Sequence, residues 1–400
     1  RSHHVGGRRF LWAHPNSMTE TPFRTSLRFA LFYGAVFFVL GVVLPFWPIW
    51  LQSRGLSPAD IGIILAVGPW MRVLVDPVIT RAADHGGRGR RMLVFAAALS
   101  LIAFSGFSLV SSFWLILLIT LVYAPSFHAL IPLGDSQTMS AVLRHKLDYG
   151  RIRLWGSVTF ILGTLGVGAL LTGRDPDIIL LVIGLGLVAV LVTTLFLREQ
   201  NEARGHARWS DVLAFVRQPR FLAFVLAASA VQASHAVLNG FSSIHWKAAG
   251  HSELVVGLLW GGSVVVEIIL FAFSGAVVAR VGASRLLLLG AGTALVRWLI
   301  LAETVALPGL IVAQAMHAIT FGATYLATMH YIAGNAPEGL KATAQGAYAS
   351  LSGIIMGLAL IGSGALYSAF TGGAFYAMAG LSALALLFAM FVQARSQTHI

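Results

Sequence analysis

The residues most able to do chemistry in this sequence are a few charged side chains that interrupt long apolar stretches. Glu267, Arg297 and His317 each lie near the middle of such a stretch, and Asp135 lies near the end of another. A carboxyl group removed from water favours its protonated form, a nearby arginine favours the carboxylate, and histidine titrates near neutral pH. We therefore predict that Glu267 carries a proton, with Asp135 as the second candidate. Arg297 is the predicted counter-charge, and His317 a proton relay or a hydrogen-bonding ligand.

A second set of polar and aromatic residues in the same stretches is suited to binding a small solute. Arginine presents a planar fork that matches a carboxylate, and amide, hydroxyl and imidazole groups supply further hydrogen bonds. The predicted binding residues are Tyr33, Arg72, Gln232, His235, Asn239, Trp260, Arg297, Gln314 and His317. The alternative is permanent bridging between helices, for example by Arg72 with Asp76 at i+4 or by Glu267 with Arg297.

The composition identifies the elements that must hold these residues. Hydrophobic residues make up 57% of the 400 residues and charged residues only 10%, against about 25% charged in soluble proteins. A membrane-crossing helix needs roughly 20 apolar residues, and the long apolar runs do not alternate as in a β-barrel. The sequence therefore predicts an all-α polytopic membrane protein with twelve transmembrane helices. These are residues 27–51, 59–81, 92–111, 113–139, 150–172, 177–197, 221–246, 253–279, 285–304, 308–333, 341–368 and 372–393.

The basic residues indicate the orientation of these helices. Of 27 Lys and Arg residues, 22 fall in the tails and the loops that share their side. Three, Arg54, Arg174 and Lys247, fall in the opposite loops. By the positive-inside rule both termini are cytoplasmic, which explains the net charge of +12 without nucleic acid.

The chain divides into two halves of six helices each. Gly62 and Arg72 correspond to Gly257 and Glu267 at a shift of 195 residues, and two parallel repeats around an interfacial site are typical of transporters. Glycines in the fifth and eleventh helices, among them 166, 168, 362 and 364, predict close contacts between helices. The predicted organisation is an N-terminal tail (1–24, with 1–17 non-native or disordered), a six-helix bundle (25–197), a cytoplasmic linker (198–220), a second bundle (221–393) and a tail (394–400).

The loop after the second helix reads Thr80-Arg-Ala-Ala-Asp84-His-Gly-Gly87-Arg88-Gly-Arg90-Arg91. It resembles the Gly-x-x-x-Asp-Arg-x-Gly-Arg-Arg signature of the major facilitator superfamily, although Thr replaces the first Gly and His the first Arg. The resemblance implies a cytoplasmic gate, and the alternative is that these charges only set the topology. The predicted gating residues are Asp84, Gly87, Arg88, Arg90, Arg91, Asp148, Arg151 and Arg153.

Two further stretches resemble the phenylpropionic-acid-transporter-like branch of that superfamily, which is related to the lactose permease group. They are Asp148-Tyr-Gly-Arg-Ile-Arg-Leu-Trp-Gly-Ser157 and Gln314-Ala-Met-His317-Ala-Ile-Thr-Phe-Gly322. The resemblance implies proton-linked uptake of a small organic solute by alternating access. The lactose permease relatives place a Glu one turn after the His of the tenth helix, whereas this sequence has Thr320 there, which moves the predicted coupling role to Glu267.

The sequence therefore predicts a proton-coupled symporter of a small organic solute such as an aromatic carboxylic acid, in a bacterial inner membrane. Nucleoside or sugar symport is the alternative within the fold, and a membrane-embedded enzyme or a non-transporting sensor is the alternative from another class. No phosphate-binding loop or metal-spaced motif occurs, so we expect no enzyme activity, no cofactor and a proton gradient as energy source. The expected partners are the solute, protons and the lipid bilayer, with no nucleic acid, and a monomer suffices.

Overall fold

The computed structural model describes residues 21–84, 89–199, 217–336 and 341–397. For residues 76–84, 342 and 395–397 it describes the backbone and not the side chains. Every regular element in this part of the chain is a helix, which confirms the all-α prediction. The predicted segment 1–17 and the predicted gating residues Gly87 and Arg88 lie outside the described residues.

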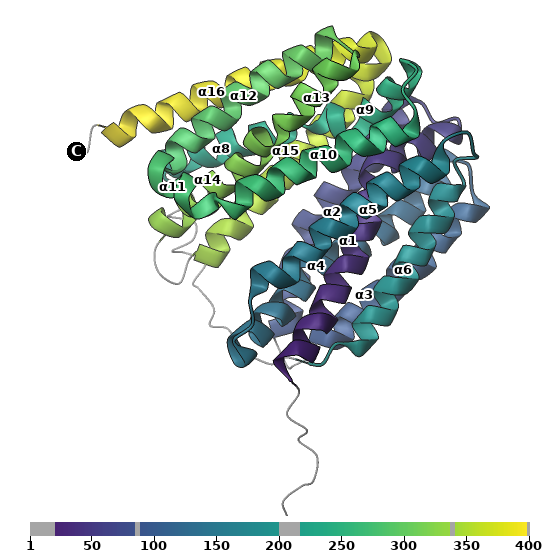
Figure 1. Cartoon of the computed structure of the whole chain (residues 1–400). Helices are drawn as coiled ribbons and strands as arrows, with labels where there is room; N and C mark the ends of the chain where they lie inside the picture. The colour runs from purple at the N-terminus through teal and green to yellow at the C-terminus, as the bar shows by residue number, and fades with distance from the viewer. Residues whose placement is uncertain (1–20, 85–88, 200–216, 337–340, 398–400) are drawn as a thin grey trace, which may run out of the picture.

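The helices before the linker pack mainly against one another. They are α1 (Pro22–Ser53), α2 (Pro58–Asp84), α3 (Gly89–Ser105) with the short η1 (Gly106–Leu109), α4 (Phe113–His145), α5 (Tyr149–Leu171) and α6 (Ile178–Phe196). We call them the first group (Figure 1).

The helices after the linker form the second group. They are α8 (Pro219–Ala233), α9 (Ala236–Ala248), α10 (Glu253–Ala272), α11 (Ser274–Val281), α12 (Ala283–Glu303), α13 (Leu307–Ala315), η2 (Ala318–Ala323), α14 (Thr324–Asn335), α15 (Lys341–Phe370), η3 (Thr371–Gly373) and α16 (Ala374–Gln397).

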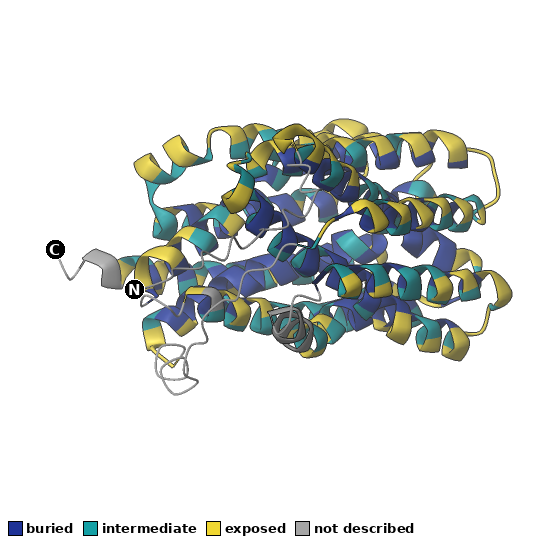
Figure 2. Cartoon of the chain, turned by 90° about the horizontal axis from the view of Figure 1, so that it is seen from below, coloured by how far each residue is buried: buried dark blue, intermediate teal, exposed yellow. Residues whose placement is uncertain are grey.

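The lengths and surfaces of these helices suit a bilayer. Eleven segments of the described residues are long and apolar enough to cross a membrane, and the last, Thr343–Ala394, contains both α15 and α16. Buried residues face the interior of each group, and exposed residues lie on the outer surfaces (Figure 2). Large apolar side chains on those surfaces, such as Ile102 at 71% exposure and Trp114 at 73%, would be costly in water. They are the expected contacts with lipid tails.

Two spans of the second group are interrupted where polar residues gather. The seventh consists of α8 and α9, with Ser234 and His235 at the break. The tenth consists of α13, η2 and α14, and η2 is a π-helical turn. Such turns often occur at functional sites, and discontinuous helices line the binding sites of many transporters.

The two groups meet mainly through α2 against α15 and through α5 against α10. Glycine permits these contacts, because a Cβ at Gly62 would lie 2.6 Å from the Leu360 carbonyl oxygen and one at Gly168 would lie 2.6 Å from that of Glu253. A Cβ at Gly364 would similarly lie 2.5 Å from the carbonyl oxygen of Pro58. The predicted close contacts are thus confirmed at Gly168 and Gly364.

The contacts between the groups are concentrated at one end of the molecule. Gly62 lies near the start of α2, Gly364 near the end of α15, Gly168 near the end of α5 and Glu253 at the start of α10. From this narrow end the groups diverge toward the wide end, where α1 begins and α16 ends (Figure 1). By contrast, a Cβ at Gly166 would meet nothing within 4 Å, and the same holds for Gly362, so these two predicted contacts are absent.

Candidate functional site

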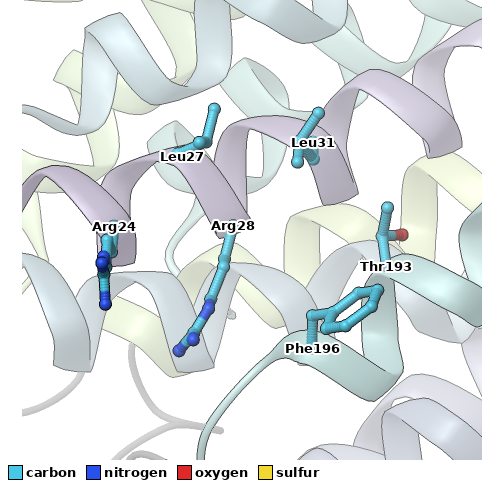
Figure 3. A pocket seen from close by; sticks show the side chains of 6 residues that line it. All are labelled: Arg24, Leu27, Arg28, Leu31, Thr193 and Phe196. Atoms are coloured by element: carbon cyan, nitrogen blue, oxygen red, sulfur yellow. The ribbon is translucent and has the colours of Figure 1, made fainter. Parts of the chain in front are cut away.

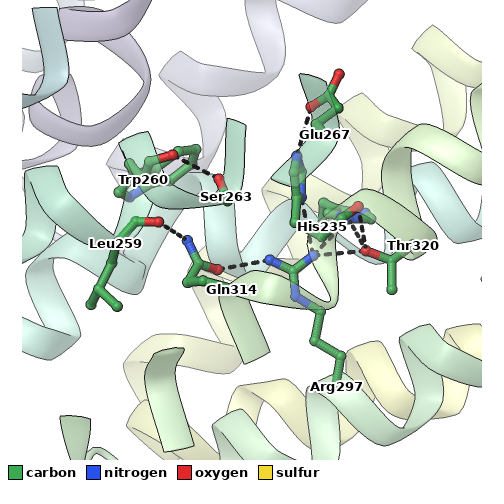
Figure 4. A network of polar contacts seen from close by, with 9 residues as sticks. His235, Leu259, Trp260, Ser263, Glu267, Arg297, Gln314 and Thr320 are labelled. Atoms are coloured by element: carbon green, nitrogen blue, oxygen red, sulfur yellow. Dashed lines mark hydrogen bonds and ion pairs between the residues drawn. The ribbon is translucent and has the colours of Figure 1, made fainter. Parts of the chain in front are cut away.

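The centre of the candidate site is Arg297 of α12, whose side chain is fully buried. Its Nη2 donates to Oε1 of Gln314 at 2.7 Å, and its Nη1 donates to Oγ1 of Thr320 at 2.8 Å (Figure 4). Nη1 also lies 3.2 Å from Nε2 of His235 and 3.2 Å from Nδ1 of His317. The buried charge is therefore stabilised by neutral acceptors, as burial of a cation requires.

These contacts determine which nitrogen of each histidine carries the proton. A guanidinium group has donors only, so the nitrogens that face Arg297 must be acceptors. In His235 the other nitrogen, Nδ1, then donates to the Val231 carbonyl oxygen at 3.0 Å. In His317 the proton must sit on Nε2. Both rings are thus held neutral by Arg297.

Glu267 of α10 lies beyond His317. Its Oε2 is 3.5 Å from Nε2 of His317, and both side chains keep some exposure, 17% for Glu267 and 14% for His317. With the proton on Nε2, His317 is oriented to donate to the carboxylate. The sequence led us to expect Arg297 as the direct partner of Glu267, but His317 contacts both residues and lies between them.

The interrupted helices bring these side chains together. His235 stands at the break between α8 and α9, and the π-helical turn η2 presents His317 and Thr320 to the same guanidinium. Gly322 of η2 lets α10 approach, because a Cβ there would lie 3.0 Å from Cδ2 of Leu270 and 3.5 Å from Cγ of Glu267. Glu267 therefore packs against the turn that carries its histidine partner.

The first group contributes a carboxylate of its own. Asp135 of α4 accepts hydrogen bonds from the hydroxyl of Tyr33 on α1 and, at 3.1 Å, from the hydroxyl of Tyr149 on α5. The predicted residues Asp135 and Tyr33 are thus direct neighbours, and Tyr149 is a third member that the sequence did not single out.

Arg153 of α5 lies against two aromatic rings of α1. Its guanidinium carbon lies 3.7 Å from the ring centroid of Phe37 and 5.3 Å from that of Tyr33, an arrangement that favours a cation. Its helix, α5, packs against α10 of the second group, which carries Glu267. The sequence predicted Arg153 as a gating residue near the start of the helix expected at 150–172, and the structure places it on the second turn of α5. Arg153 follows Tyr149 by four residues on the same helix face, which was the signal that could have indicated Tyr149.

The other predicted binding residues have different surroundings. Gln314 uses both ends of its amide, since its Nε2 donates to the Leu259 carbonyl oxygen at 3.2 Å. Gln232 is buried and Asn239 is half-buried. The indole N–H of Trp260 is buried, and none of the described residues accepts a hydrogen bond from it. Arg72 is exposed on α2 and acts electrostatically on His128 of α4.

Two predicted gating residues have partners within the first group instead of across a gate. Asp148 caps its own helix by accepting from the backbone N–H of Arg151 at 3.1 Å, and the two side chains form an exposed ion pair at 3.5 Å. The side chain of Arg90 donates to the Leu195 carbonyl oxygen at 2.9 Å, and its backbone N–H donates to Glu199. Arg91 is exposed, and the side chain of Asp84 lies outside the described ones.

No group of three or more potential metal ligands occurs among the residues that the structure describes.

The chain is similar along most of its length to known transporters. The family described as "MFS_1 like family" matches residues 26–384. A "Probable 3-phenylpropionic acid transporter" of Escherichia coli (strain K12) is 37% identical over 375 residues, which cover 91% of this chain and 96% of that protein. A maltose permease of Geobacillus stearothermophilus is 26% identical over 325 residues, covering 81% and 82%.

Solved structures share the fold. The nucleoside transporter NupG matches with a TM-score of 0.79 at 14% identity, covering 92% of this chain and 98% of that one. A bacterial homologue of the human lysosomal transporter Spinster, inward-facing and unoccupied, matches with a TM-score of 0.73 at 16% identity, covering 95% and 98%. At such identities the likeness concerns the fold alone.

Proposed function

This chain belongs to the MFS_1-like family of transporters, and from that premise we propose that it carries a small aromatic carboxylic acid together with a proton. The chain is a multi-pass membrane transporter of a small molecule and not an enzyme, because its relatives and its fold are those of transporters. Beyond this, we propose the class of the substrate and its coupled transport with a proton. The proton gradient is the energy source, and transport needs no cofactor.

The observation that carries the proposal is the packing of α5, which holds Arg153, against α10, which holds Glu267. Arg153 stacks on Phe37, so an aromatic surface lies directly beside a cation that can bind a carboxylate. Glu267 in turn lies 3.5 Å from Nε2 of His317, whose Nδ1 faces Arg297. In this proposal the carboxylate of an aromatic acid binds Arg153, and its ring lies against Phe37.

The placement of Arg153 and Glu267 on facing helices offers a direct way to couple the transport of the substrate to that of the proton. While Arg153 is free, its charge stabilises the carboxylate of Glu267. When a substrate carboxylate neutralises Arg153, Glu267 loses that stabilisation and takes up a proton more readily. By linkage, a proton on Glu267 strengthens substrate binding by the same factor, so substrate and proton move together. Asp135, held by two tyrosines, is the second candidate for the proton.

We further propose that the two groups of helices are the two six-helix halves that alternate between sides of a bacterial inner membrane. The positive-inside distribution supports termini in the cytoplasm, which makes the wide end the cytoplasmic one. The helix contacts at the narrow end then correspond to a transporter open to the cytoplasm. One monomer contains both halves and suffices for transport.

The substrate class is supported by the relative that is 37% identical, whose name specifies 3-phenylpropionic acid. Nucleoside and sugar symport remain the alternatives. A cation beside Phe37 favours an anionic ring compound over either of them, so a neutral nucleoside or disaccharide serves as the comparison ligand.

Replacing Arg153 by Gln is expected to weaken the binding of 3-phenylpropionate by at least about 30-fold, because one partner of a charge pair is removed. Calorimetric titration of the purified protein measures this. The uncharged 3-phenylpropanol should bind weakly to both proteins and show no such difference. Arg144→Gln, which removes an exposed arginine at the end of α4, is the matched control and should bind the acid as wild type does. Undiminished binding to Arg153→Gln would refute the proposed substrate site.

A further inference from the structure

A solute carried between the two groups of helices must contact side chains of both groups. The groove of about 220 Å³ between α1 and α6 does not meet this condition, because helices of the first group alone line it (Figure 3). Its lining residues are Arg24, Leu27, Arg28, Leu31, Thr193 and Phe196. Polar side chains directed toward the space between the groups are better candidates for selecting the solute.

His128 of α4 is a histidine near the middle of an apolar helix, and the mechanism proposed above does not use it. Its side chain is half-buried, and no residue that the structure describes forms a hydrogen bond with its imidazole. An imidazole can donate one hydrogen bond and accept another. A histidine within a membrane-crossing helix faces the interior of the bundle or a partner, so His128 is a candidate for contact with the solute.

A glycine of α2 makes room for this ring. A Cβ at Gly68 would lie 2.9 Å from Nε2 of His128, closer than Cβ atoms approach their neighbours in proteins. Any other residue at position 68 would therefore displace the imidazole. Arg72 follows Gly68 by one helical turn on the same face of α2, so the imidazole lies next to the turn that carries Arg72.

The face of α2 that carries Arg72 is directed toward the second group. Arg72 follows Leu65 by seven residues on one face of the helix, and a Cβ at Gly240 of α9 would lie 3.4 Å from Cδ1 of Leu65. The exposed residues Trp70 and Leu74 lie on a different face of α2, which is expected to meet lipid. The groups diverge from the narrow end (Figure 1), so the imidazole beside Arg72 borders the space that opens between them.

The second group contains a similar pair on the corresponding helices. Glu267 lies on α10, the second span of that group, where it corresponds to Arg72 by the shift of 195 residues. His317 lies on the fourth span and contacts the carboxylate of Glu267. In the first group the second and fourth spans, α2 and α4, again bring a charged residue and a histidine together, with the charge reversed. This repetition favours a role in the solute site over a role in packing alone.

The separation between His128 and the level of Arg153 suits an aromatic acid. Along α4, His128 precedes Asp135 by seven residues on the same face, a rise of about 10.5 Å. Asp135 accepts a hydrogen bond from the hydroxyl of Tyr33, and the ring of Tyr33 lies 5.3 Å from the guanidinium carbon of Arg153. This separation is comparable to the length of an arylpropionic acid from its carboxylate to the far edge of its ring.

We propose that His128 is a specificity-determining residue that hydrogen-bonds a hydroxyl group on the ring of the transported acid. The carboxylate binds Arg153, the ring lies against Phe37, and the hydroxyl reaches the imidazole. The preferred substrates are then aromatic acids whose ring carries a hydroxyl opposite the side chain with the carboxylate. This inference rests on the substrate site proposed above at Arg153, and it adds which aromatic acids are preferred.

The test compares the binding of 3-phenylpropionate with that of 3-(4-hydroxyphenyl)propionate by calorimetric titration of the purified full-length protein. Wild type should bind the hydroxylated acid about 3- to 10-fold more tightly, which is the effect of one additional hydrogen bond. His128→Phe should remove this preference and leave the affinity for 3-phenylpropionate unchanged. His128→Gln, whose amide can donate and accept, should keep part of the preference.

Gly68→Ala tests the same claim without altering the histidine. The added methyl group should displace the imidazole and reduce the preference for the hydroxylated acid. His330→Phe, which replaces an exposed histidine of α14, is the matched control and should keep both affinities.

Selective loss of the preference distinguishes a contact with the hydroxyl from a structural role, because a distorted protein would bind both acids more weakly. Equal affinity of wild type for the two acids would overturn the inference. An equal loss of affinity for both acids in His128→Phe and in Gly68→Ala, or an unchanged preference in both variants, would also overturn it. Undiminished binding of 3-phenylpropionate to Arg153→Gln would instead refute the substrate site on which the inference rests.

Discussion

Replacing Glu267 by Gln is expected to abolish the accumulation of substrate against its gradient while exchange of external for internal substrate continues. Glutamine keeps the size of the side chain and can still accept a hydrogen bond from His317, but it cannot carry a proton. With one proton per substrate, each pH unit of gradient supports about tenfold accumulation, and the variant should take up substrate no faster than protein-free liposomes do. Uptake of radiolabelled 3-phenylpropionate into proteoliposomes with an imposed pH gradient measures accumulation. Counterflow measures the exchange of external for internal substrate.

The matched control for this prediction is Glu303→Gln. Glu303 is exposed at the end of α12, where it accepts a hydrogen bond from the hydroxyl of Tyr376, and lies away from the polar cluster. This variant should accumulate substrate as wild type does. If Glu267→Gln still accumulates substrate, the proton is carried elsewhere, and the same measurement on Asp135→Asn then identifies the second candidate.

Replacing Arg297 by Gln is expected to impair both folding stability and transport. The guanidinium serves acceptors on Gln314, Thr320 and the two histidines, all inside the second group. A buried acceptor that loses its donor costs about 1–3 kcal/mol, and a shorter amide cannot reach all of them. The melting temperature of the purified variant should fall markedly, and uphill uptake should be lost at temperatures where the variant is still folded.

Arg297→Lys separates the charge from the geometry. An ammonium group is a point charge without the planar fork, so it cannot serve the acceptors on both sides at the distances observed. We expect it to restore part of the stability and little of the uphill uptake. Arg285→Gln at the start of the same helix, where the side chain is exposed, should change neither quantity. A fully active Arg297→Lys protein would contradict the role given to the hydrogen-bond geometry.

Hydropathy predicted the membrane-crossing helices well, because an apolar run of sufficient length has few other structures available to it. It could not predict their interruptions. The span expected at 308–333 contains the π-helical turn η2, and the span expected at 221–246 is broken at His235. Neither break alters the apolar pattern, although residues at both breaks, His235 and Thr320, contact Arg297.

The candidate site was predictable only in part. Glu267, Arg297 and His317 were singled out because charges within apolar segments are costly and must have partners, and the structure places them in one cluster. The order of the contacts, with His317 between the two charges, depends on how α10, α12 and η2 pack. Arg153 was assigned to the gate because it follows other basic residues closely, while its stacking on Phe37 requires α1 and α5 to lie side by side.

In the proposed mechanism, binding of an aromatic acid by Arg153 and protonation of Glu267 are linked. This linkage is tested most directly by adding 3-phenylpropionate to weakly buffered proteoliposomes and recording the external pH. Glu267→Gln proteoliposomes in parallel correct for passive permeation of the acid. We expect the wild-type protein to alkalinise the medium in step with substrate uptake, beyond the change seen with the variant. Substrate uptake by the wild-type protein without any proton movement beyond that of the variant would contradict it.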